Sequence, residues 1–203
     1  MVDVVSIVVG IISLIIGIIG AIYTYKAYIR ERALKTISWD DIQNGVRYIW
    51  KKLKKIEFVP DIMISPDPKS GIIAFTLAQY FDKDILIDVG QAFRRESTVS
   101  QLFSDECYTV VKTNKWKVLL SKQLECIQNK ENVKILVVDD FILSGDFNTK
   151  LIDFLIQQGY KEENIIVCCL AVTKVAISSA KSPNYSWKTV DDEDFYFPWG
   201  KAE

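Results

Sequence analysis

The sequence predicts an α/β fold in which a parallel sheet is flanked by helices, preceded by one transmembrane helix. Apolar strands alternate with helical segments through most of the 203-residue chain, and this order is typical of a parallel sheet covered on both faces. Near the N-terminus lies an apolar run of about 20 residues, the length that a bilayer-spanning helix requires. Aliphatic and aromatic residues make up 49% of the chain, so a folded core is available.

Composition also excludes several classes of function. The formal net charge is -1 at pH 7, so the chain lacks the basic footprint of a general DNA or RNA binder, and we expect no nucleic-acid partner. The chain contains no histidine, which excludes Ser-His-Asp and Cys-His nucleophilic catalysis and histidine-ligated metals. Four cysteines lack the paired spacing of a zinc site and are interpreted as free thiols: Cys107, Cys126, Cys168 and Cys169.

The N-terminal segment, residues 1–25, is interpreted as a transmembrane anchor. Residues 4–23 comprise only apolar side chains, glycine and two serines. A secretory signal peptide is the alternative, but the leader Met1-Val2-Asp3 carries a negative charge instead of the usual positive one. Basic residues follow the span and predict a single-pass membrane protein with a cytoplasmic C-terminal domain: Lys26, Arg30, Arg32 and Lys35.

The anchor and the basic linker after it, residues 26–36, suggest two partners. The lipid bilayer is the first. The second is another copy of the chain, because Ser13, Gly17 and Ala21 recur every fourth residue and create a face where two helix backbones can approach closely. Glycine is also simply common in membrane helices, so this alternative stays open.

The remaining domain, residues 37–203, is predicted to begin with an amphipathic helix over residues 39–56. Ser38 is its expected N-cap. Asp40 and Asp41 fall in the first turn, where the helix dipole favours negative charge.

The following elements alternate between strand and helix. They are a strand at 61–65, a loop with Pro66 and Pro68, a helix at 70–81, a strand at 84–89, a helix around 119–129, a strand at 134–138, a helix at 147–158 closed by Gly159, and a strand at 165–172. Residues 90–117 are polar without a clear period and are the least predictable part; in an enzyme, a mobile loop within them would exclude water from the site. Ligands bind beyond the carboxyl ends of parallel strands, where Pro66 and Asp139 fall.

Residues 133–149 are the most informative stretch. An apolar strand ends in the acidic pair Asp139 and Asp140, and Ser144 and Gly145 follow in a short loop before a helix. The carboxylates can hold ribose hydroxyls or a magnesium-bound pyrophosphate, and amides at a helix N-terminus can hold a phosphate. The pattern therefore predicts a sugar-phosphate site.

Two other interpretations of the acidic pair have less support. A response-regulator receiver domain also opens with a strand that ends in two aspartates, but it needs four more strands and a phosphoacceptor, and only 63 residues follow Asp140. The second interpretation is that the pair only caps the following turn, where aspartate is common. Ser144 and Gly145, which begin four residues after Asp140, favour the phosphate site instead.

Val137-Val138-Asp139-Asp140, followed by Ser144-Gly145, resembles the signature of type I phosphoribosyltransferases, closest to the purine-salvage members. The resemblance covers roughly residues 37–200. It implies a site for 5-phosphoribosyl diphosphate (PRPP) and Mg²⁺, in which Asp139 and Asp140 would be the catalytic, ribose-binding and metal-binding acids. The loop around the 5-phosphate would then consist of Ile142, Leu143, Ser144, Gly145, Asp146 and Phe147.

Further matches to this family lie outside the signature. The resemblance implies that Lys69, Ser70 and Gly71 contact PRPP in the pyrophosphate loop. Lys174 resembles the lysine that reads the exocyclic oxygen of a purine, and Phe197 and Trp199 resemble the tail that closes over the base. The alternatives are that Lys174 is a solvated lysine at a strand end and that the aromatic tail packs in the core.

The chain also departs from the family pattern. Phe147 stands where the family usually has threonine, and Pro66-Asp67-Pro68 replaces small, glycine-rich residues. Asp146 brings a negative charge beside the expected phosphate, which is costly unless the side chain points away or a cation neutralises it.

Two functions are therefore expected. The first is a membrane-anchored phosphoribosyltransferase that transfers ribose 5-phosphate from PRPP to a purine base. Its oxocarbenium-like transition state, as the family implies, needs positioning and charge stabilisation rather than a nucleophile, which suits a chain without histidine. The second is a catalytically weak nucleotide-binding sensor or membrane effector in a bacterial regulatory or antiviral system, which the departures and the anchor favour.

Overall fold

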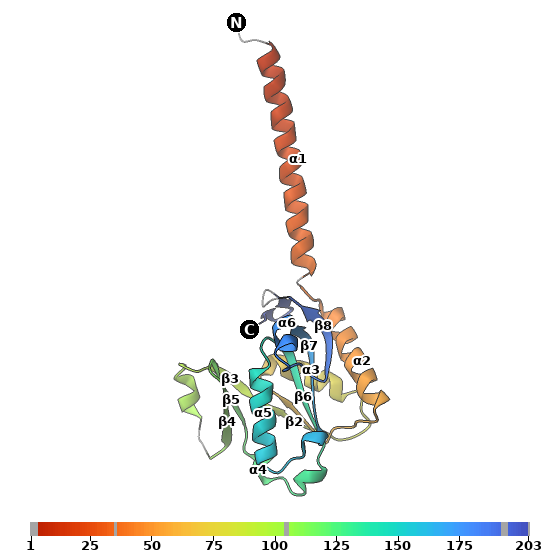
Figure 1. Cartoon of the computed structure of the whole chain (residues 1–203), viewed down its shortest axis with the longest axis vertical. Helices are drawn as coiled ribbons and strands as arrows, with labels where there is room; N and C mark the ends of the chain where they lie inside the picture. The colour runs from red at the N-terminus through yellow and green to blue at the C-terminus, as the bar shows by residue number, and fades with distance from the viewer. Residues whose placement is uncertain (1–3, 35, 104–105, 192–194, 203) are drawn as a thin grey trace.

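The computed structural model describes residues 4–34, 36–103, 106–191 and 195–202 (Figure 1). Helix α1 (Val4–Leu34) projects away from the rest of the chain and continues from the predicted anchor into the predicted linker. Within the described ranges, its stretch Val9–Tyr28 is the one helix long and apolar enough to cross a membrane, and all of it is exposed. A signal sequence would meet the same criterion. The leader Met1-Val2-Asp3 and Lys35 lie outside the described residues.

The rest of the chain is built on a five-stranded parallel sheet flanked by helices, which confirms the predicted fold class. The strands lie in the order β2 (Leu86–Val89), β1 (Ile62–Ser65), β6 (Ile135–Ile142), β7 (Ile165–Thr173) and β8 (Tyr185–Val190). The three inner strands are buried along their whole length, as expected for a parallel sheet covered on both faces.

Helices cover both faces of this sheet (Figure 1). One core cluster lies under α2 (Trp39–Lys55) and α3 (Pro68–Ala78), and the other lies under α5 (Asp146–Gln157). Helix α2 begins as predicted, because the Ser38 hydroxyl accepts the amide of Asp41 at 3.1 Å and the Asp41 carboxylate accepts the amide of Ser38 at 2.9 Å.

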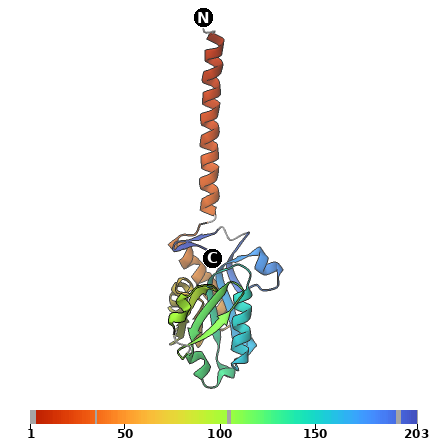
Figure 2. The ribbon, with the colours of Figure 1, turned by 90° about the vertical axis from the view of Figure 1, so that its left-hand side faces the viewer.

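A second sheet lies largely within residues 90–117, the stretch without a clear period in the sequence (Figure 2). It is antiparallel, in the order β3 (Gln91–Arg94), β5 (Trp116–Ser121) and β4 (Tyr108–Lys112), with the 3-10 turn η1 (Val99–Leu102) before β4. The helix predicted around 119–129 is wrong. Val118, Leu119 and Leu120 belong to β5, where cross-strand pairing outweighs local helical spacing, and only α4 (Gln123–Cys126) is helical.

Gly90 joins the two sheets. Its amide donates to the carbonyl of Ser65 at 2.8 Å, and a Cβ at this position would lie 2.7 Å from the carbonyl oxygen of Pro66. The Asp88 carboxylate accepts the amide of Ser121 at 3.1 Å, and burial raises the pKa of Asp88. The second sheet is therefore held against the edge where the Pro66 loop begins.

The C-terminal elements return to the foot of α1 (Figures 1 and 2). After the short turns η2 (Lys130–Asn132) and η3 (Glu162–Asn164) and helix α6 (Lys174–Ser178), the chain ends in the hairpin β9 (Tyr196–Phe197) and β10 (Gly200–Lys201). Thr36 forms a bridge with Tyr196, and the amide of Ile37 donates to the Tyr196 carbonyl at 3.0 Å. The segment after the predicted anchor is thus bonded to the C-terminal hairpin.

Candidate functional site

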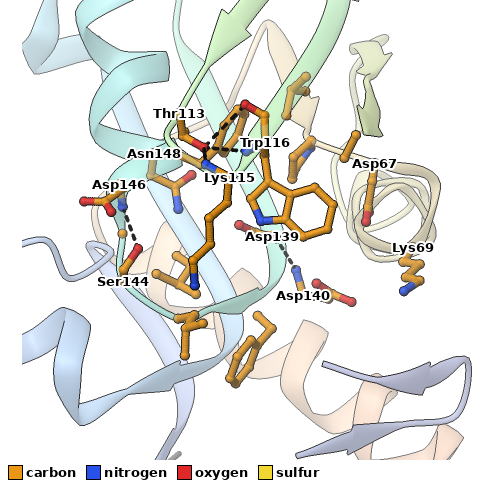
Figure 3. Close-up of a pocket in the computed structure, with 18 of the residues that line it drawn as sticks. Asp67, Lys69, Thr113, Lys115, Trp116, Asp139, Asp140, Ser144, Asp146 and Asn148 are labelled. Atoms are coloured by element: carbon orange, nitrogen blue, oxygen red, sulfur yellow. Dashed lines mark hydrogen bonds between the residues drawn. The ribbon is translucent and has the colours of Figure 1, made fainter. Parts of the chain in front are cut away.

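A pocket of about 580 Å³ opens at the carboxyl ends of β1 and β6 (Figure 3). Its wall is formed by the start of α3, the end of β6 with the loop to α5, the hairpin between β4 and β5, and Lys201 of β10. This is the edge of the sheet where a parallel fold binds its ligands.

The acidic pair lies inside β6 and not at its tip, so the predicted end of this strand is corrected. The ladder with β7 pairs Asp139 with Cys169 and Phe141 with Ala171, and it runs on to Ile142. Asp140 is skipped, and the alternation of side chains shifts there: Val138 and Phe141 both belong to the core on the α2 and α3 face. The ladder is thus irregular at the pair, and both carboxylates reach the pocket.

Burial shapes the charge of both carboxyls, whose residues are 8% and 9% exposed. Burial, then the charges of Asp140 and Asp67, hold the pKa of Asp139 well above its usual range. Burial, then the charge of Asp67, raises the pKa of Asp140 to about 6. Hydrogen bonds from Asn148 and Trp199 oppose these shifts, on Asp139 and Asp140 respectively.

The loop after the pair is shaped by Gly145. This residue has a φ of 74°, in the left-handed region that favours glycine, and a Cβ there would lie 2.3 Å from the carbonyl oxygen of Lys181. Thr173 donates from its hydroxyl to the Leu143 carbonyl at 2.5 Å and ties the loop to β7. Ile142, Leu143, Ser144 and Gly145 line the pocket just before the N-terminus of α5.

Asp146 is neutralised by a cation. Its carboxylate accepts from the Lys181 ammonium at 2.5 Å, and this hydrogen bond, followed by one from Ser144, lowers the pKa of Asp146. The side chain is half exposed, so the pair adds little stability, but it offsets the charge expected beside a phosphate. Phe147 lines the pocket and packs on the core under α5.

The start of α3 contributes fewer pocket residues than predicted. Lys69 lines the pocket together with Asp67, whereas Ser70 and Gly71 are buried in the helix. The Asp67 carboxylate caps α3 by accepting both the amide of Ser70, at 2.8 Å, and its hydroxyl, at 2.5 Å. Gly71 allows close packing on Val89, because a Cβ would lie 3.1 Å from that side chain.

The three residues expected to bind a base do not line this pocket. The Lys174 side chain is 70% exposed and forms an ion pair with Asp191, which raises the pKa of Lys174. Phe197 is buried in the core. Trp199 stacks on Phe197, with ring centroids 5.2 Å apart, and its Nε1 donates to Asp140 Oδ2 at 2.8 Å.

Replacing Trp199 with phenylalanine is therefore expected to lower the free energy of unfolding by about 1–3 kcal/mol near pH 7.5. The aromatic ring stays, but a buried carboxylate loses its N–H donor. Denaturant unfolding in mild detergent measures the change. The control is Trp39→Phe, since Trp39 is 56% exposed and its ring packs in a T-shaped arrangement on the Trp199 ring, with centroids 5.7 Å apart. Equal effects of the two substitutions would show that the hydrogen bond to Asp140 contributes nothing.

Comparison with known proteins identifies the fold. No family model and no curated protein matches the sequence. A purine phosphoribosyltransferase from Pyrococcus horikoshii Ot3 matches in structure with a TM-score of 0.56 and 19% identity, over 82% of this chain and 93% of that one. The chain has the phosphoribosyltransferase fold. The APRTase from Giardia lamblia complexed with 9-deazaadenine also matches, with a TM-score of 0.55 and 13% identity over 73% and 79% of the two chains.

A third solved structure that matches is a hypothetical protein from Neisseria gonorrhoeae with bound ppGpp. It matches with a TM-score of 0.59 and 18% identity, over 81% of this chain and 89% of that one. Identities this low establish the fold alone. The pocket of this chain lies at the carboxyl edge of that phosphoribosyltransferase fold.

Sequence reasoning missed several residues of the pocket in this phosphoribosyltransferase fold, among them Lys115, Trp116, Asn148 and Lys201. Asn148 donates to the Asp139 carboxylate, and its buried Oδ1 has no hydrogen-bond partner among the described residues, so a ligand donor can bond to it. The signal in the sequence that could have identified Asn148 is its place in the first turn of α5, directly after the expected phosphate loop.

The acidic pair suits Mg²⁺ that arrives with a phosphorylated ligand. Mg²⁺ binds few protein carboxylates and completes its shell with water and phosphate oxygens. The charge of Asp140 raises the pKa of Asp139, a repulsion that a divalent cation relieves. Among the described residues, no group of three or more acidic or cysteine side chains is arranged to hold a metal. The chemistry of the pair thus fits a cation shared with the ligand.

Proposed function

We propose that the protein is a membrane-anchored phosphoribosyltransferase that transfers ribose 5-phosphate from PRPP to a purine base. One observation carries the proposal: Asp139, Asp140 and the Ser144–Gly145 loop line a single pocket at the carboxyl edge of a phosphoribosyltransferase fold. The purine phosphoribosyltransferase named among the structural matches supports the choice of acceptor.

Each part of the pocket has a task in this reaction. Asp139 and Asp140 bind the ribose hydroxyls and place negative charge where positive charge develops on the sugar. Ser144 and the amides at the start of α5 hold the 5-phosphate, and Lys69 faces the leaving diphosphate. Mg²⁺, when bound by the two carboxylates and the substrate, neutralises charge on the leaving group.

The test is product formation by the purified protein in detergent. PRPP and Mg²⁺ are supplied with guanine, hypoxanthine or xanthine, and nucleotides are separated by chromatography. We expect one of these bases to yield its mononucleotide together with pyrophosphate. No nucleotide from any base would refute the enzymatic proposal.

A nucleotide-binding module without turnover is the second candidate. Two contacts favour it: Trp199 already bonds to Asp140, and the Phe147 side chain stands in the wall where the family has threonine. The ppGpp-bound structure from Neisseria gonorrhoeae has the same fold. Calorimetry with mononucleotides and with PRPP discriminates, because binding without product formation supports the module.

The anchor is proposed from α1. Val9–Tyr28 would span the bilayer, the C-terminal domain would be cytoplasmic, and Ser13, Gly17 and Ala21 would mediate self-association. Cys107 and Cys126 are exposed free thiols and suit a membrane-impermeant maleimide. We expect labelling only after the inner membrane is opened. Soluble protein lacking α1 would instead identify a cleaved signal peptide.

A further inference from the structure

The hairpin between β4 and β5 forms the wall of the pocket opposite the acidic pair (Figure 3). Strand β5 of this hairpin also pairs with β3, where Arg94 lies opposite Trp116 and Ala92 opposite Val118. Because side chains alternate along a strand, these four lie on one face of the second sheet. Ala92, Trp116 and Val118 line the pocket, so this face is turned toward Asp139.

Trp116 is held in place from both sides. The Thr113 hydroxyl accepts the amide of Trp116 at 2.9 Å, and the Thr113 amide donates to the Trp116 carbonyl at 2.9 Å. The Arg94 guanidinium lies over the indole at 5.8 Å from its centroid. Figure 3 shows the indole projecting from the hairpin into the pocket above Asp139.

The other aromatic side chains of the pocket wall are occupied by the core. Phe141 stacks on Phe195, with ring centroids 6.2 Å apart, and Phe147 packs on the core under α5. Trp116 belongs to neither core cluster. It therefore offers the pocket a flat apolar surface, which suits an aromatic base.

Lys115 brings a positive charge to the same wall. Its side chain runs from the hairpin turn into the pocket, and in the view of Figure 3 its ammonium ends between Ser144 and Asp139. An ammonium that lines the same pocket as the expected 5-phosphate loop suits a phosphate oxygen. The pocket thus combines a ring surface, a pair of ribose-binding acids and a phosphate-binding cation.

We propose that Trp116 stacks on the base and Lys115 contacts the 5-phosphate, so that the hairpin selects purine 5'-mononucleotides as ligands. The inference rests on the proposed function, because it takes Asp139 and Asp140 as the ribose site. It assigns to Trp116 the base contact that sequence resemblance gave to Phe197, Trp199 and Lys174.

Two kinds of ligand, mononucleotides with a base and ribose 5-phosphate without one, separate the base contact from the sugar-phosphate contact. The full-length protein in detergent, with Mg²⁺, is titrated calorimetrically with GMP, AMP and ribose 5-phosphate. Trp116→Ala should weaken the preferred mononucleotide roughly 10- to 100-fold and leave ribose 5-phosphate unchanged, because only the nucleotide carries a base. Trp116→Phe should restore most of the loss. Lys115→Gln should weaken both kinds of ligand by a similar factor.

Three outcomes overturn the inference. The first is unchanged mononucleotide affinity in Trp116→Ala, the second is an equal loss of ribose 5-phosphate affinity in that variant, and the third is failure of Trp116→Phe to restore affinity. Circular dichroism verifies folding, and Trp116→Leu replaces the alanine variant if that one does not fold. If the wild type binds neither mononucleotides nor ribose 5-phosphate, both the base contact and the proposed function are refuted. If the wild type binds ribose 5-phosphate but the Trp116 variants do not behave as expected, only the base contact is refuted.

Discussion

Replacing both Asp139 and Asp140 with asparagine is expected to reduce kcat/KM for nucleotide formation by roughly 1,000-fold or more, yet to stabilise the fold at pH 7.5. Asparagine keeps the shape and an acceptor oxygen for Trp199, but it cannot neutralise positive charge on the sugar or hold a cation. It also removes two buried negative charges, whose mutual repulsion adds to the free-energy cost of burying them. Steady-state kinetics and denaturant unfolding measure the two effects.

The stability gain has a defined pH dependence. The pKa of Asp140 is about 6 in the folded protein against 3.8 ordinarily, so over that interval the folded state keeps a proton that the unfolded state has lost. The free energy of unfolding therefore falls as pH rises from about 4 to 6, by roughly 3 kcal/mol for this group, and the loss persists above pH 6. Asp139 acts in the same direction.

The matched comparison is the wild type against the double variant, without Mg²⁺, between pH 4 and 8. The other carboxyls titrate in both proteins, so the difference isolates the acidic pair. If the free energies of unfolding of the two proteins change in parallel with pH, burial of the two carboxylates does not destabilise the folded protein. If the double variant turns over substrate as fast as the wild type, this edge of the sheet is not the active site.

Gly145→Ala is expected to lower the free energy of unfolding by about 2–4 kcal/mol and to weaken PRPP binding. The φ of 74° costs an alanine about 1 kcal/mol, and the new Cβ would lie 2.3 Å from a backbone oxygen of Lys181. Relief of that contact must move the loop amides expected to hold the 5-phosphate. Denaturant unfolding and calorimetry report the two effects.

Gly159→Ala is the matched control for this substitution. Gly159 also has a positive φ, 96°, but its nearest atom to a new Cβ is Lys130 Cδ at 4.0 Å. We expect a loss of about 1 kcal/mol and unchanged PRPP affinity. If the two variants lose equal stability, the contact with Lys181 does not constrain the loop.

Local patterns predicted most of the central architecture. Apolar runs marked β1, β6 and β7, and Ser38 with Asp41 marked the start of α2, because burial and capping act within a few residues. The spacing from Asp139 to Gly145 placed the acids and the loop at one edge, since a strand followed by a short turn leaves little freedom.

Contacts between distant residues were beyond local patterns. Trp199 bonds to Asp140 across 59 positions, and Lys181 pairs with Asp146 across 35. The second sheet depends on pairing across turns, which local patterns do not show: residues 90–117 looked polar and aperiodic, and residues 119–129 looked helical. Trp116 could therefore not be placed in the pocket until the hairpin itself was seen.

The central claim is that the edge carrying Asp139 and Asp140 binds PRPP. Calorimetric titration of the full-length protein with PRPP and Mg²⁺ tests it most directly, with the double asparagine variant as control. We expect saturable binding of one PRPP per chain by the wild type and no measurable binding by the variant. Absence of PRPP binding to the wild type, or equal affinity in the variant, would contradict it.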